Sequence, residues 1–105
     1  MSLPIYKKLN VRFRVEPGCL GPDGINHVER FCKYAALRMD ASYIRWVITP
    51  RYDKSLPEIE YKVGNKQINP YQAQQYLIVL DKSMENFEEI LQEKLAELID
   101  EFLGR

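Results

Sequence analysis

The stretch SMENFEEILQEKLAELIDEFL, residues 83–103, decides the fold of this chain. Its apolar residues recur at steps of three and four, so on a helix that turns about 100° per residue they form one stripe. That stripe consists of Met84, Phe87, Leu91, Leu95, Leu98, Ile99 and Phe102. Acidic side chains occupy most of the opposite face. Such a helix is stable only when its stripe is covered, so the preceding residues should supply that cover.

Three earlier segments alternate between apolar and charged residues, a pattern typical of half-buried strands. They are residues 9–16, 43–49 and 58–63. Gly64-Asn65 then favours a tight hairpin turn that returns the chain through a short strand, residues 66–68. Because each strand has one apolar side and one charged side, helices should cover only one face of the sheet.

Two further helices are expected, over residues 24–39 with Asp23 as a cap, and from Asn69-Pro70 to about residue 80. The order is therefore β-α-β-β-β-α-α. This order predicts an α+β fold with a small three- or four-stranded mixed sheet and helices packed on one face. The first two strands can lie parallel through a right-handed crossover. Residues 1–105 should form a single compact domain with residues 1–8 loosely held.

The composition is that of an ordinary soluble protein, with 46% hydrophobic and 29% charged residues among 105. No apolar run approaches the roughly 18 residues that a membrane helix needs, and the N-terminus lacks the apolar segment of a secretory signal. Two cysteines do not make a disulfide framework, which indicates a reducing compartment. We therefore expect a cytoplasmic protein without a membrane partner.

The net charge is zero, but it is unevenly distributed. Residues 1–82 hold 13 Lys and Arg against 8 Asp and Glu, a balance of +5, and residues 83–105 carry the compensating −5. Attraction between the basic body and the acidic helix within one fold explains this asymmetry. The alternative explanation is a basic face that meets an anionic partner.

The glycine-rich segment 18–24 lies between a strand and a helix start, where backbone N–H groups can bind phosphate. Its G-x-x-G-x-x-G spacing matches neither the dinucleotide fingerprint nor the P-loop, so no cofactor is expected. Cys19 and His27 are candidate catalytic residues, because a helix N-terminus favours a thiolate and His27 is the only histidine. Their spacing with Cys32 does not suit zinc, and no metal site is predicted.

The loop after the second strand contributes candidate ligand-binding residues. If the first two strands are parallel neighbours, this loop and Asp23 come to the same carboxyl edge of the sheet, where ligands commonly bind. A guanidinium there can clamp a carboxylate or phosphate. The alternative is a solvated loop with internal ion pairs. The candidates in the loop are Arg51, Tyr52, Asp53 and Lys54.

The charged side of the strands suggests a further hypothesis, weak nucleic-acid binding. Sheet-face RNA binders need aromatic residues on which bases stack, and Tyr43 is the only aromatic expected on this side. Cross-strand pairs between arginine and glutamate explain the same residues without a ligand. The charged residues concerned are Arg12, Arg14, Arg45, Glu58, Glu60 and Lys62.

Self-association is the interpretation that the sequence favours. The final helix would be about 30 Å long at 1.5 Å per residue. Ile90 projects from its acidic face, and the preceding helix carries apolar groups on both faces at residues 77–79. We therefore expect a binding or assembly module, rather than an enzyme, that forms a homodimer through its C-terminal helices.

A small-molecule-binding protein or an enzyme is the main alternative. Its site would lie at the loops around Cys19, His27 and Arg51. The sequence names neither a substrate nor a reaction for such a site.

Overall fold

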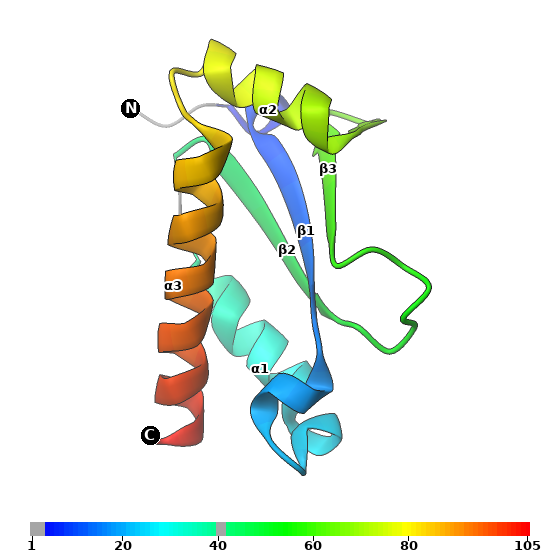
Figure 1. Cartoon of the computed structure of the whole chain (residues 1–105), viewed down its shortest axis with the longest axis vertical. Helices are drawn as coiled ribbons and strands as arrows, with labels where there is room; N and C mark the ends of the chain where they lie inside the picture. The colour runs from blue at the N-terminus through cyan, green and yellow to red at the C-terminus, as the bar shows by residue number, and fades with distance from the viewer. Residues whose placement is uncertain (1–3, 40–41) are drawn as a thin grey trace.

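The computed structural model describes residues 4–39 and 42–105, which form one four-stranded mixed sheet and three α-helices (Figure 1). The predicted α+β class and the order of strands and helices are confirmed, with two short 3-10 helices in addition. The predicted helix break at residues 40 and 41 lies outside the described residues. The elements are η1 (Ile5–Lys7), β1 (Leu9–Val15), η2 (Pro17–Leu20), α1 (Gly24–Arg38), β2 (Ile44–Pro50), β3 (Ile59–Val63), β4 (Lys66–Ile68), α2 (Pro70–Val79) and α3 (Met84–Leu103).

The strands lie in the order β2-β1-β3-β4. β1 and β2 are parallel and joined through α1, as the sequence predicts, whereas β1–β3 and β3–β4 are antiparallel. Gly64 has a φ of 61° in the turn between β3 and β4, a conformation that glycine adopts without strain.

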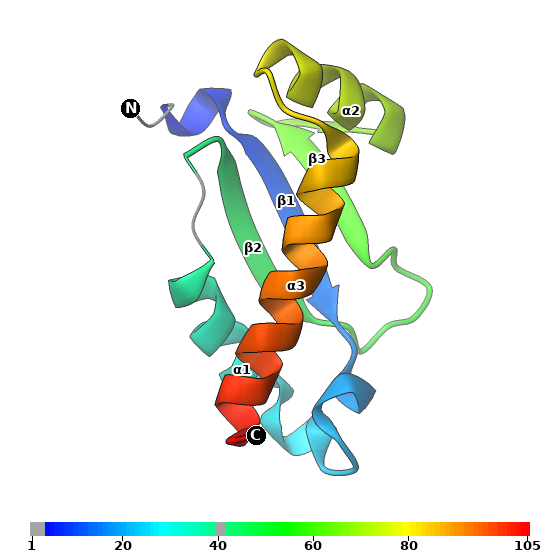
Figure 2. The same ribbon diagram turned by 60° about the vertical axis from the view of Figure 1, so that its left-hand side comes forward.

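α1 and α3 pack on one face of the sheet, and α2 lies across its end (Figures 1 and 2). The predicted stripe of α3 faces the sheet, with Phe87, Leu91, Leu95 and Leu98 buried. The Ser83 hydroxyl caps this helix by accepting from the backbone N–H of Asn86 at 3.1 Å. The final helix is therefore the cover of the sheet's apolar face.

Aromatic rings hold both ends of α3. Near its C-terminus the ring of Phe102 meets that of Phe31 on α1, with centroids 5.4 Å apart. Near its N-terminus Phe87 stacks on Trp46 of β2 at 5.7 Å. The helix is thus tied to the sheet at one end and to α1 at the other.

Of the caps predicted for α1 and α2, the structure confirms Asn69 and does not confirm Asp23. Asn69 and Gln72 form a complete capping box at the start of α2, because each side chain accepts from the other's backbone N–H, at 2.7 and 3.0 Å. Asp23 occupies the N-cap of α1, but its side chain makes no capping hydrogen bond, so that prediction is wrong. Its backbone has φ −97° and ψ 17°, outside the extended conformation that directs an N-cap side chain to the helix.

Two residues expected on the charged side of the sheet lie elsewhere. Tyr43 is half-buried against the core, and the Lys82 ammonium lies 5.0 Å from its ring centroid. Glu58 lines a groove with Cys19 and residues of α3. Both residues stand just outside the strands, where the strict alternation of faces no longer applies.

Candidate functional site

No helix of the described chain covers the sheet face opposite α1 and α3 (Figure 1). Every second side chain of a strand points to this face. We call it the open face and define it by six residues. The pairing register places them in two rows across β2, β1 and β3: Arg45, Asn10 and Lys62, then Val47, Arg12 and Glu60.

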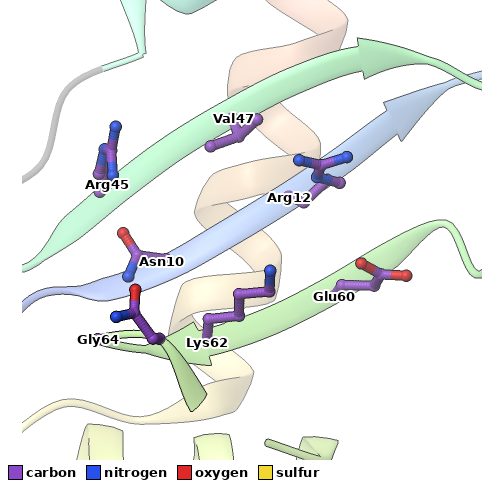
Figure 3. A pocket seen from close by; sticks show the side chains of 8 residues that line it. Asn10, Arg12, Arg45, Val47, Glu60, Lys62 and Gly64 are labelled. Carbon is purple, nitrogen blue, oxygen red and sulfur yellow. The ribbon is translucent and has the colours of Figure 1, made fainter. Parts of the chain in front are cut away.

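The open face is hollowed. The hollow has a volume of about 410 Å³, which lies in the range of small-molecule sites. Figure 3 shows its side chains rising from three neighbouring strands, with Arg45 and Lys62 on either side of Asn10. The turn between β3 and β4 closes one end. The lining residues are the six of the open face together with Gly64 and Asn65.

Among the described lining residues Glu60 carries the one carboxylate, and it is paired with an arginine. Glu60 Oε1 lies 3.1 Å from Arg14 Nη1, which also donates to the Pro57 carbonyl at 2.7 Å. Arg14 is buried, so this pair is screened little by solvent. In the part of the chain that the structure describes, the cross-strand arginine–glutamate pair expected from the sequence forms at Arg14 only.

Three cations of the hollow have no ion-pair partner among the described residues. Within the described residues Arg12, Arg45 and Lys62 make neither an ion pair nor a side-chain hydrogen bond. With about 4.8 Å between strands, the Cα atoms of Arg45 and Lys62 lie about 10 Å apart on either side of Asn10. This cluster creates a positive potential that attracts anions.

Asn10 sits at the centre of this cluster. Its Oδ1 is buried and has no hydrogen-bond partner among the described residues. A buried polar atom without a partner is rare in a folded protein and calls for a physical reason. The Nδ2 of the same amide can donate to a bound anion, whereas Oδ1 is an acceptor and needs a donor such as a hydroxyl group of the ligand.

In the loop after β2, where the sequence predicts a ligand site, Arg51 is bonded to other groups of the protein. Arg51 contacts Glu16 with its Nη1 2.5 Å from Oε1, and it also donates to the carbonyls of Lys54 and Leu56. These bonds close the loop after β2 against the end of β1. Binding of a ligand by Arg51 would have to break them, and it stays a prediction.

The other loop candidates also make internal contacts. The Tyr52 hydroxyl donates to Glu29 on α1 at 3.1 Å, and partial burial together with this bond raises the pKa of Tyr52. Asp53 accepts from the hydroxyl and the backbone N–H of Ser55, and these bonds lower the pKa of Asp53. Lys54 is exposed. The arrangement stabilises a turn; its role in binding remains a prediction.

Cys19 and His27 have different surroundings. Cys19 is exposed and lines an apolar groove with Ala96 and Ile99 of α3, whereas His27 accepts from Arg30 at 2.6 Å on the outside of α1. No hydrogen bond joins the two side chains in the described chain. The described residues also contain no group of three or more His, Cys, Asp and Glu placed to hold a metal.

The two thiols should differ sharply in reactivity. Cys32 is buried, and burial, with Glu29 nearby, raises the pKa of its thiol to about 11, whereas Cys19 is exposed. We expect a maleimide at neutral pH to modify one cysteine per native chain, at Cys19, and both after denaturation. Mass spectrometry of the labelled peptides would show this, and rapid native labelling of Cys32 would contradict the structure.

Large apolar side chains are exposed on the C-terminal helices. Ile78 and Val79 on α2 are 56% and 78% exposed, and Ile90 on α3 is 50% exposed. Leu77, which directly precedes them on α2, is fully buried. The homodimer expected through these helices therefore stays a proposal.

Comparison of the chain with protein-family models found no match, and searches of curated proteins and of solved structures found no significant match. No helix among the described residues is long and apolar enough to cross a membrane.

Proposed function

We propose that this protein is a binding module that holds a small polyanion, bearing phosphate or carboxylate groups, in the hollow of its open face. The observation that carries the proposal is the set of three cations, Arg12, Arg45 and Lys62, which have no ion-pair partner among the described residues and surround the half-buried side chain of Asn10. Guanidinium groups bind such anions through paired hydrogen bonds, and an ammonium adds a point charge.

The lining supports binding rather than catalysis. Among its described residues the one carboxylate, on Glu60, is held by Arg14, and the others offer amides, cations, a valine and a glycine. A general base needs a free group that can take a proton near neutral pH. The lining residues provide none.

The same residues favour a compact anion over single-stranded nucleic acid. No aromatic residue of the described chain lines the hollow, and Tyr43 lies off the open face. Base stacking supplies much of the affinity of proteins that bind single strands. Without stacking, a nucleic acid would bind to this face through its phosphate charges alone. Such binding is weak and strongly salt-dependent, as it would be for any polyphosphate.

Titration calorimetry with tripolyphosphate and with citrate tests the proposal. Replacing Arg12, Arg45 and Lys62 together by glutamine should weaken binding at least about 100-fold, because each lost charged hydrogen bond contributes about 1.5–3 kcal/mol. The matched control removes the same charge from Lys33, Lys54 and Lys66, which are exposed outside the open face, and should change affinity less than about tenfold.

Two results would contradict the proposal. One is a wild-type protein that binds neither polyanion at low salt. The other is equal weakening in the two triple variants, which would mean that net charge, and not the hollow, attracts the anion.

A further inference from the structure

Among the described residues, β2 is an edge strand that has no partner strand on its outer side. In its parallel pairing with β1, the Tyr43 carbonyl accepts from Leu9 and the Arg51 N–H donates to Val15, so odd-numbered residues bond inward. The N–H and C=O groups of Ile44, Trp46 and Ile48 consequently point away from β1. Within the described residues β2 has no neighbour on that side (Figure 2).

The two edges of the sheet are unequal. β4, at the other edge, has three residues, two of which are the exposed Lys66 and Gln67. Short and polar edges resist pairing with other chains. β2 has seven residues, and Arg45 is its only charge. The sheet therefore protects one edge and leaves the other open.

Apolar hollows flank the open edge on the helix side. One, of about 110 Å³, lies beside Tyr43, Trp46 and Ile90. The other, of about 350 Å³, lies beside Ile48 and Pro50 under α1. A chain that paired with β2 would bury this apolar surface as well as the backbone groups.

We propose that β2 pairs antiparallel with β2 of a second copy, about a two-fold axis at Val47. This register opposes Trp46 to Ile48 of the second copy on the apolar side. These two residues can then exchange both backbone hydrogen bonds. On the open face it sets Arg45 against Thr49 and Val47 against itself, so no like charges meet.

Self-complementarity is what selects a second copy as the occupant. When the seven residues of β2 pair with the same seven residues of a second copy, apolar side chains face each other on the helix side. On the open face, Arg45 faces the neutral Thr49. The pairing also places the open faces of both copies on the same side of one continuous sheet, because the axis is perpendicular to it. The pairing does not require a bound anion, although Arg45 and Val47 belong both to this edge and to the hollow.

Charge swapping at Val47 tests the interface with the full chain. In sedimentation equilibrium the wild-type protein should reach twice the chain mass of 12.4 kDa. Val47→Glu and Val47→Lys should each raise the dissociation constant at least tenfold, because like charges would meet at the axis. An equimolar mixture should recover the dimer, since opposite charges then face each other.

Two misfolded variants would not form a dimer when they are mixed, so recovery of the dimer excludes misfolding. Circular dichroism of each variant checks the fold directly. Gln67→Glu, at the protected edge, is the control and should leave the dimer intact. A wild-type monomer at every concentration would overturn the proposal. A dimer that survives both Val47 changes but is lost on replacing Ile78, Val79 and Ile90 by serine would also overturn it, in favour of an interface on the C-terminal helices.

Discussion

Replacing Phe31 by alanine is expected to lower the free energy of unfolding by about 3–5 kcal/mol. Phe31 is fully buried, and its ring meets Phe102 edge to face at 5.4 Å and stacks on Tyr34 at 6.5 Å. Removing the ring loses apolar burial and leaves a cavity between α1 and the last turns of α3. Urea denaturation followed by circular dichroism measures the loss.

Leu37→Ala is the matched control on the same helix. Leu37 is 84% exposed, so its truncation should change the free energy of unfolding by no more than about 0.5 kcal/mol. If Phe31→Ala costs no more than this control, α1 and α3 do not pack through these rings.

Gly24→Ala is expected to destabilise the protein by about 3 kcal/mol, the upper end of the usual range for overpacking. A Cβ at Gly24 would lie 1.7 Å from the Pro17 carbonyl oxygen and 2.7 Å from its carbon. Both atoms belong to the backbone of η2, so no side-chain rotation relieves the clash. The start of α1 must move away from η2, which would expose Leu20.

Gly18→Ala provides the control for this change. No atom lies within 4 Å of a Cβ at Gly18, so alanine fits there without displacement. Thermal unfolding of both variants would separate the two effects. Equal melting temperatures would show that the glycine of α1 is not required for close packing against η2.

The fold could be predicted from the sequence where the signals are local. The stripe of α3, the Asn69 capping box and the Gly64 turn each depend on residues within a few positions of one another. The η2 helix could not be foreseen in the same way. Prolines and glycines indicate a turn there but do not distinguish a 3-10 turn from other loop geometries.

The candidate site could be predicted only in part, because it depends on register between distant strands. The charged sides of the strands are visible in the sequence, but the row that sets Asn10 between Arg45 and Lys62 follows from pairing across 35 and 52 positions. No local pattern contains that information. The position of Asn10 at the centre of the cations emerges only once the three strands are paired.

Three arginines illustrate why residue type alone does not assign a role. Arg14 is buried and neutralises Glu60, and Arg51 closes a loop through Glu16 and two carbonyls. Arg12 lines the hollow without a partner in the described chain. All three stand at or near strands in the sequence, and only the contacts separate structural arginines from one that is free to bind.

The central claim, that the open face holds a polyanion, is tested most directly by a nuclear magnetic resonance titration of the labelled protein with tripolyphosphate. We predict saturable shifts of the amides around Asn10, Arg45 and Lys62, with the amides of α3 unchanged. No saturable shift, or shifts centred on the glycine segment 18–24 at the start of α1, would contradict the account.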